Sequence, residues 1–202
     1  MTEFRKINSN DNIEMIATWI YQTEDSFNRL FFNDSVRAVT GIERLIMSDD
    51  INPYHRNFIT VIYDDDPNEI GGIVVGYKGS QIQPYSKFKA IYETSCSEIF
   101  HILANEVVNK LNSSTIDDDE YYIGNLYVNP KYRNRGFGSK LVQYSKRKAR
   151  MENSRVIILD VKRRKKELID YYRKLGFEIS GTHFYRFLGK TYGTYAMSCS
   201  LK

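Results

Sequence analysis

One seven-residue run, residues 155–161, constrains the fold more than any other segment of the chain. Its sequence, RVIILDV, is rich in β-branched residues and apolar on both faces of a strand. A strand of that kind lies inside a sheet and is covered on both faces. The chain around it has strand patterns at 121–128, 177–187 and 194–201 and helix patterns at 139–153 and 165–177. This order of strand, loop, helix, strand, helix and strand predicts a mixed α/β fold.

The N-terminal segment predicts one more strand and one more helix. Residues 4–8 form a short strand pattern, and Ser9 or Asn10 is suited to cap a helix over 11–25. The apolar residues of that helix recur at helical spacing and include Trp19, so this side chain is expected in the core rather than at a ligand.

The middle of the chain predicts a hairpin and an insertion. Two apolar runs, 57–66 and 70–79, lie on either side of a Pro-Asn-Glu turn and predict an antiparallel hairpin. The amphipathic stretch 98–114 predicts a helix within an insertion at about 80–119. Because no repeat or low-complexity linker divides the chain, a single domain over 1–202 is expected.

The charge of the chain is small but uneven. The formal net charge is +4, with basic runs at 146–150 and 162–166 and acidic runs at 64–66 and 117–120. Each run is expected to be a solvated helix or loop face. A nucleic-acid partner is not expected, because such proteins carry a larger and more continuous basic surface.

The chain offers no obvious metal site or membrane span. Cys96 and Cys199 have neither metal-ligand spacing nor the pattern of a disulfide framework, so no metal is expected. No apolar stretch approaches the ~18 residues of a membrane span. The N-terminal stretch MTEFRKINSND has no apolar run of the kind found in signal peptides, so a signal peptide is not expected. The protein is expected to be cytoplasmic.

The junction at 127–142, YVNPKYRNRGFGSKLV, has features of a phosphate site. Arg133, Gly136 and Gly138 spell R-x-x-G-x-G between a predicted strand and a predicted helix. Glycines let backbone N–H groups approach a ligand, and a helix N-terminus favours negative charge. The loop therefore suits a pyrophosphate, with a tight structural turn as the alternative. It is neither the Rossmann fingerprint nor a P-loop, since G-x-G-x-x-G and Gly-Lys-Ser/Thr are both missing.

This junction resembles motif A of the GNAT superfamily, the GCN5-related N-acetyltransferases. The family's second hallmark is a helix that reads N-x-x-A-x-x-[LF]-Y-x-x-x-G-F, and KKELIDYYRKLGF supplies Tyr172, Gly176 and Phe177 at the same spacing. The resemblance covers roughly residues 121–177. It implies an α/β (α+β) GNAT fold: a mixed, mostly antiparallel central sheet with splayed fourth and fifth strands, flanked by helices.

The resemblance also implies where acetyl-CoA binds. The coenzyme would lie between the splayed strands and take hydrogen bonds from the backbone of Leu126, Tyr127 and Val128. Its pyrophosphate would lie on the loop residues Arg133, Asn134, Arg135, Gly136, Phe137, Gly138 and Ser139. The family's Asn falls on Lys165 here and its Ala on Leu168, so this chain lacks the Asn that typically contacts the pantetheine arm. Lys165 is expected either to reach a phosphate or to face water.

Two residues are candidates for catalysis. By resemblance, Tyr172 would stabilise the leaving thiolate and a backbone N–H near Val128 would meet the oxyanion. The fourth-strand positions that hold a base in several relatives are Tyr122 and Gly124, and neither is a base. Glu120 lies on the same face of that strand by alternation and could act through water, or belong to a solvated loop. Tyr171 is expected on a different part of the helix.

The expected activity is transfer of an acetyl group from acetyl-CoA to a primary amine of a small molecule or peptide, by direct attack in a ternary complex. A different acyl-CoA, or a catalytically weak coenzyme-binding or regulatory module, remain alternatives, as does a nucleic-acid-binding module using the basic runs. A homodimer is expected because the apolar face of the predicted insertion helix must be covered.

Overall fold

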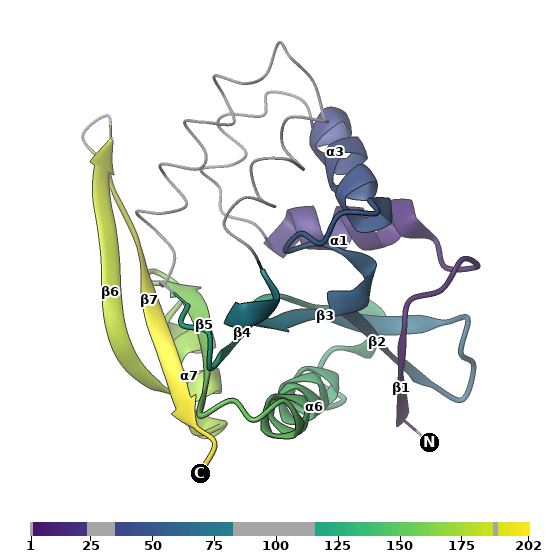
Figure 1. The fold of residues 1–202 in the computed structure, drawn as a ribbon. Helices are drawn as coiled ribbons and strands as arrows, with labels where there is room; N and C mark the ends of the chain where they lie inside the picture. Colours follow the sequence, from purple (N-terminus) through teal and green to yellow (C-terminus); the bar gives the residue numbers. More distant parts are fainter. Residues whose placement is uncertain (1, 24–34, 83–115, 188–189) are drawn as a thin grey trace.

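The computed structural model describes residues 2–23, 35–82, 116–187 and 190–202. Within these ranges seven strands form one sheet in the order β1-β2-β3-β4-β5-β7-β6 (Figure 1). The strands are β1 (Thr2–Lys6), β2 (Ile59–Asp64), β3 (Ile70–Lys78), β4 (Glu120–Val128), β5 (Val156–Lys162), β6 (Glu178–Phe187) and β7 (Lys190–Ser200). Neighbouring strands run antiparallel except β4 and β5, which are parallel. The predicted mixed, mostly antiparallel sheet and the predicted hairpin (β2 and β3) are confirmed.

Helices cover both faces of the sheet (Figure 1). On one side α1 (Ile13–Thr23) and α3 (Ser35–Met47) pack against β2 and β3, and we call this the α1/α3 face. On the other side α6 (Phe137–Met151) and α7 (Lys166–Lys174) pack against β4, β5 and β7, and we call this the α6/α7 face. Three short 3-10 turns complete the described elements: η1 (Arg56–Phe58), η2 (Gly79–Gln81) and η3 (Pro130–Tyr132).

Strand β5 lies inside the sheet, between β4 and β7, as its apolar sequence predicts. Ile157, Leu159 and Val161 point into the core of the α6/α7 face, so Ile158 and Asp160 point toward the opposite face by alternation. Ile158 is buried, whereas Asp160 is a half-buried carboxylate in an otherwise apolar strand.

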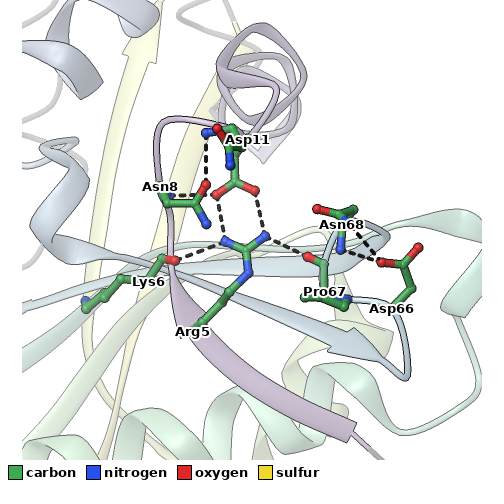
Figure 2. A network of polar contacts seen from close by, with 8 residues as sticks. Arg5, Lys6, Asn8, Asp11, Asp66, Pro67 and Asn68 are labelled. Carbon is green, nitrogen blue, oxygen red and sulfur yellow. Dashed lines mark hydrogen bonds and ion pairs between the residues drawn. The ribbon is translucent and has the colours of Figure 1, made fainter.

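An ion pair fastens β1 to the start of α1 (Figure 2). Two nitrogens of the Arg5 guanidinium donate to the two carboxylate oxygens of Asp11 at 2.7 and 2.6 Å, and one of them also donates to the Pro67 carbonyl at 2.7 Å. The Asp11 side chain is 5% exposed. Burial by itself raises the pKa of Asp11, but hydrogen bonds from Arg5 and the Asn8 amide hold that pKa below its usual value. The pair therefore ties β1, α1 and the β2–β3 turn together.

The first helix begins later than its sequence suggests. The chain makes one further turn before α1 starts at Ile13. The side-chain oxygen of Asn12 accepts a hydrogen bond from the Met15 amide at 2.9 Å, which is the N-cap interaction. The predicted cap at Ser9 or Asn10 is therefore wrong.

The basic run at 146–150 is only partly the solvated face that the sequence predicts, because Arg147 and Arg150 are exposed whereas Lys146 is buried. Lys146 is 7% exposed, and its ammonium group donates to the Leu175 carbonyl at the C-terminal end of α7 at 2.6 Å. Cations are favoured at that end of a helix. The Lys148 ammonium group lies 3.7 Å from the carboxylate of Glu152, the residue that caps the C-terminus of α6. Two cations of the run thus serve the fold rather than a basic surface.

The insertion predicted at about 80–119 falls mostly outside the described residues, as does the helix predicted at 98–114 and Cys96. The chain is described up to Ile82 and again from Ile116. A single domain over 1–202 stays a prediction. Among the described residues, no helix is long and apolar enough to cross a membrane.

Candidate active site

Strands β4 and β5 part near the middle of the sheet. They pair along Glu120–Ile123 only, and the last pair joins Ile123 to Leu159. Beyond this point β4 follows β3 as far as Val128, while β5 follows β7 as far as Lys162. Among the described residues, the second half of β4 therefore has no strand neighbour on its β5 side. The predicted splay of the fourth and fifth strands is confirmed.

A β-bulge lies at the point of parting. Gly124 is an extra residue in the register between β4 and β3, and bulges of this kind change where a strand directs its side chains. Ile123 packs into the core of the α6/α7 face, yet the Asn125 side chain donates to the Thr23 hydroxyl of α1 at 2.8 Å. The bulge thus reverses the alternation of β4 beside the gap.

The loop between β4 and α6 leads into a helix whose first backbone N–H groups have no partner within the helix. Asn134 and Gly136 have left-handed φ angles of 61° and 79°, and Gly136 is the N-cap of α6. The Lys140 amide makes the first bond within the helix, to the Gly136 carbonyl at 3.0 Å. The amides of residues 137–139 therefore have no carbonyl partner in their own helix. Amides turned this way form a concave anion site.

The two glycines of the loop have different surroundings. A Cβ added at Gly136 would meet nothing within 4 Å, so bare backbone lies against open space there. A Cβ at Gly138 would lie 2.8 Å from the Tyr171 hydroxyl. The first glycine leaves room for a ligand, and the second lets a side chain of α7 approach the loop. These features fit the pyrophosphate that the sequence predicts at this loop.

The arginines of the loop lie against neighbouring groups without being buried. The Arg133 Nε donates to the Val128 carbonyl at 3.3 Å, and its guanidinium lies 5.9 Å from the Tyr127 ring centroid. Arg135 lies 5.5 Å from the ring centroid of Tyr132. Both side chains are exposed, so their charge acts at the surface of the loop.

Two further loop residues have structural contacts. Phe137 is 2% exposed and its ring stacks on Tyr132 with 5.0 Å between centroids, so only its backbone can serve a ligand. The Lys140 ammonium donates to the Thr2 hydroxyl of β1 at 2.5 Å. Lys140 therefore points away from the gap between β4 and β5.

Tyr171 reaches the loop, a contact that the sequence analysis did not predict. Its hydroxyl oxygen is 3.2 Å from the Ser139 hydroxyl oxygen, and it lies beside Gly138. Burial raises the pKa of Tyr171, while the contact with Ser139 acts in the opposite direction. A neutral phenol therefore stands at the N-terminus of α6.

Tyr172 is held by the way in which α7 ends. The Phe177 amide donates to the Tyr172 carbonyl at 3.1 Å, the Gly176 amide donates to the Arg173 carbonyl at 2.9 Å, and Gly176 has a φ of 83°. This is a Schellman motif, and the predicted end of the helix at Gly176 is confirmed. The rings of Tyr172 and Phe177 pack edge to face with 5.7 Å between centroids.

The burial of Tyr172 bears on its predicted role. The residue is 6% exposed and lies in the core of the α6/α7 face. Burial raises the pKa of its phenol, and the neighbouring Tyr171 adds to the effect. Among the described residues, no hydrogen bond holds the Tyr172 hydroxyl. Such a phenol suits donation of a hydrogen bond rather than loss of a proton.

The other predicted catalytic residue, Glu120, begins β4 at the end of the strand away from the loop. One carboxylate oxygen lies 3.6 Å from an Arg155 nitrogen, and the other accepts from the Asp117 amide at 3.0 Å. Lys165 is exposed and is the N-cap residue of α7. Among the described residues, no hydrogen bond or ion pair joins Glu120 to the loop.

A polar pair that the sequence analysis missed lies where the strands part. The Tyr122 hydroxyl donates to the Asp160 carboxylate at 2.9 Å. The signal in the sequence was the one acidic residue in the apolar run 155–161. Tyr171 was missed as a loop contact because its approach depends on how α7 packs against α6. Among the described residues, no three His, Cys, Asp or Glu side chains gather closely enough to hold a metal ion.

Comparison with solved structures shows the same fold at low sequence identity. An N-acetyltransferase from Staphylococcus aureus Mu50 superposes with a TM-score of 0.69 at 20% identity, over 96% of this chain and 99% of that chain. The ribosomal-protein-S18-alanine N-acetyltransferase from Escherichia coli superposes with a TM-score of 0.55 at 12% identity, over 100% of this chain and 95% of that chain. A chain of the NatC complex bound to Gag peptide and CoA superposes with a TM-score of 0.56 at 15% identity, over 100% of this chain and 99% of that chain. No curated protein sequence matches the chain significantly.

The family comparison covers the splayed strands, the loop and the end of α7. The model of the acetyltransferase (GNAT) family matches residues 41–177, about two thirds of the chain. The matched range includes the Gly136 loop and ends at Phe177. Both sequence motifs that resemble the family, and the splayed strands β4 and β5, therefore fall inside it. This chain belongs to the acetyltransferase (GNAT) family.

Proposed function

We propose that this protein transfers the acetyl group of acetyl-CoA to a primary amine of a small molecule or peptide. The observation that carries the proposal is the parting of β4 and β5 after Ile123 and Leu159, beside the helix N-terminus at Gly136. A gap between strands next to a phosphate site suits a ligand with a diphosphate at one end and an extended arm. Acetyl-CoA has this shape.

The backbone geometry supports the coenzyme contacts that the family resemblance implies. The amides of residues 137–139 and the left-handed turn at Asn134 would face the pyrophosphate, with Arg133 and Arg135 supplying charge. Because the second half of β4 lies along the gap, the backbone of residues 126–128 would bind the pantetheine arm. Lys165, exposed at the start of α7, would reach a phosphate or face water.

The reaction that we propose needs no covalent enzyme intermediate. The amine nitrogen attacks the thioester carbon, the carbon–nitrogen bond forms, the carbon–sulfur bond breaks, and CoA leaves as a thiolate that takes up a proton. An alkyl ammonium with a pKa of about 10.4 costs roughly 4.6 kcal/mol to deprotonate at pH 7. The site must offset this cost with a base, a water chain or desolvation.

Tyr172 would assist the leaving group as a neutral donor. Its raised pKa makes full proton transfer to sulfur less favourable than it is for an ordinary phenol. A hydrogen bond from its hydroxyl to the developing thiolate stabilises negative charge without that transfer. For Glu120, the contacts with Arg155 and the Asp117 amide favour a structural role over that of a base.

The proposal can be tested by incubating the protein with acetyl-CoA and a panel of alkylamines, polyamines, amino sugars and peptides with free N-termini. We expect thiol release that depends on the amine, together with a product heavier by one acetyl group. Succinyl-CoA and longer acyl-CoAs in a parallel series test the alternative donors. If no amine accelerates thiol release from any of these donors, the proposed transfer is wrong and a coenzyme-binding module without catalysis becomes the better account.

The remaining expectations stay predictions. A homodimer was expected from the helix at 98–114, which lies outside the described residues. A cytoplasmic location also stays a prediction. The inward placement of Lys146 supports the view that nucleic acid is not the partner, because it breaks up one basic run.

A further inference from the structure

Helix α1 packs against the half of β4 that lies beside the gap, residues 125–128. The Asn125 side-chain amide donates to the Thr23 hydroxyl at 2.8 Å, and the Trp19 ring stacks on the Tyr127 ring with 5.0 Å between centroids. Asn125 and Trp19 are both buried. Among the described residues, this half of β4 pairs with a strand on its β3 side only. Contacts from α1 therefore restrain a strand segment that has one unpaired edge.

The Thr23 hydroxyl joins the end of α1 to β4. Thr23 is the last residue of α1, and its hydroxyl donates to the Ile20 carbonyl at 2.7 Å while it accepts the bond from Asn125. A hydroxyl has one proton and two lone pairs, so it makes both bonds at once. The bond to the helix backbone fixes the direction of the Thr23 side chain, and its oxygen is therefore held in place as an acceptor for Asn125.

The backbone of β4 directs its polar groups alternately toward β3 and toward the gap. The amide of Asn129, which follows β4, donates to the Gly71 carbonyl of β3 at 2.9 Å. In an antiparallel ladder, residues two apart direct their N–H and C=O groups to the same side, so Tyr127 also faces β3. Leu126 and Val128 lie at the alternate positions. Their backbone N–H and C=O groups therefore face the gap.

The bulge at Gly124 decides which residues these are. Because it adds one residue to β4, it shifts by one position the set of backbone groups that faces the gap. A bulge also interrupts the ladder, so the strand is less restrained by β3 where the bulge lies. Asn125 is the next residue after the bulge, and the bond to Thr23 holds it on the α1/α3 face. That bond restrains β4 where its second half begins.

We propose that Thr23 is a positioning residue that acts through Asn125: their hydrogen bond holds β4 after the bulge in the arrangement that binds the pantetheine arm. This inference rests on the proposed function. Helix α1 thereby contributes to the affinity for acetyl-CoA through β4. The phosphate loop is joined to α7 by the contact between Ser139 and Tyr171, so its own affinity for a diphosphate is independent of Thr23.

The test compares acetyl-CoA with adenosine 3′-phosphate 5′-diphosphate, which keeps the coenzyme's nucleotide and diphosphate and lacks the pantetheine arm. Thr23→Val removes the hydroxyl and keeps the shape of the side chain. The apparent Kd rises by the factor by which the binding-competent arrangement is depopulated. Calorimetric titration should show the Kd of acetyl-CoA rising roughly 2- to 12-fold, which corresponds to the about 0.5–1.5 kcal/mol of one neutral hydrogen bond. The Kd of the nucleotide should change by less than about 2-fold, because the loop is unaltered.

Three further variants accompany Thr23→Val. Thr23→Ala also removes the hydroxyl and should give the same difference between the two ligands. Thr23→Ser keeps the hydroxyl and should retain both wild-type Kd values. Thr40→Val, on α3, removes a hydroxyl that donates to the Val36 carbonyl at 3.0 Å, as Thr23 does to Ile20. It controls for the bond within the helix and should leave both Kd values unchanged.

The outcomes separate this inference from the proposed function. A rise confined to acetyl-CoA in Thr23→Val and Thr23→Ala, with wild-type affinity in Thr23→Ser, supports the positioning role. Equal rises for both ligands, or unchanged Kd values, overturn that role while leaving coenzyme binding and acetyl transfer intact. A wild type that binds neither ligand, or that binds acetyl-CoA no more tightly than the nucleotide, overturns the coenzyme site on which the proposed function rests.

Discussion

The hydroxyl oxygens of Tyr171 and Ser139 lie 3.2 Å apart, which joins α7 to the first turn of α6. Ser139 carries one of the amides that begin α6, and Gly138 beside it has no Cβ to keep the phenol away. The α7 helix therefore contributes two adjacent tyrosines to the site by different means. Tyr171 touches the loop through its hydroxyl, and Tyr172 is packed in the core by the end of the helix.

Replacing Tyr171 with Phe should weaken coenzyme binding more than catalysis. The change removes one neutral hydrogen-bonding group at the loop, which contributes about 0.5–1.5 kcal/mol, so the Kd of acetyl-CoA should rise roughly 2- to 12-fold while kcat changes little. Calorimetric titration measures the Kd. Ser139→Ala and the double variant complete a cycle, and additive effects would mean that the two hydroxyls do not act together at the loop.

Replacing Tyr172 with Phe should weaken catalysis more than coenzyme binding. The ring and its contact with Phe177 remain, so the Kd of acetyl-CoA should be nearly unchanged, while loss of the donor to the thiolate should lower kcat by on the order of 10- to 1000-fold. Because the pKa of Tyr172 is raised, its ionisation should not lower the wild-type rate below about pH 10, the ordinary value for a phenol. Steady-state kinetics across pH measures kcat of the variant and the pH dependence of the wild-type rate.

The control for this variant is Tyr144→Phe. Tyr144 is on α6, and its ring stacks on Phe4 with 4.7 Å between centroids. Its replacement should leave kcat and the Kd unchanged. An unaltered kcat in Tyr172→Phe on a confirmed acceptor would show that this tyrosine only packs, and it would leave protonation of the thiolate to water.

Disrupting the ion pair between Arg5 and Asp11 should destabilise the fold in a manner that depends on pH. The pKa of Asp11 is lowered in the folded state, so its stabilising effect is present above the unfolded value near 3.8 and is lost as pH falls through the folded value. A double-mutant cycle of Arg5→Leu and Asp11→Asn in urea should give a coupling of about 1.5–3 kcal/mol at pH 7. The coupling should shrink below about pH 4. A coupling that is independent of pH would argue against an ionised Asp11.

Features set by local geometry could be predicted from the sequence. The Schellman motif at the end of α7 needs a residue with positive φ that is followed by an apolar side chain. Gly176 and Phe177 supply both, and the whole motif lies within the six consecutive residues 172–177. The central place of β5 follows in the same way from its apolar run. Asn12 was missed as a cap because Ser9 and Asn10 are equally good caps in isolation, and the turn before α1 decides among them.

Features that depend on packing between distant segments could not be predicted. The bulge at Gly124 follows from the register of β4 against β3, which a single strand does not reveal. The burial of Lys146 depends on where α7 ends, because its ammonium group caps that helix. Asp160 was visible as an acidic residue in an apolar run, but its partner Tyr122 becomes a neighbour only when the two strands pair.

The central claim is that the loop at Gly136 and the gap between β4 and β5 bind acetyl-CoA. The most direct measurement is the melting temperature with and without acetyl-CoA at 100 times its Kd, which should add about 2.7 kcal/mol, or roughly 5 to 11 °C for a chain of this size. Gly136→Val places a side chain in the open space over the loop and should abolish the shift, measured against the variant's own melting temperature, which strain at positive φ lowers. Gly41→Ala on α3, where an added Cβ also meets nothing within 4 Å, should keep the full shift. A wild-type protein that shows no shift, or a Gly136→Val variant that shows the same shift as the wild type, would contradict the account.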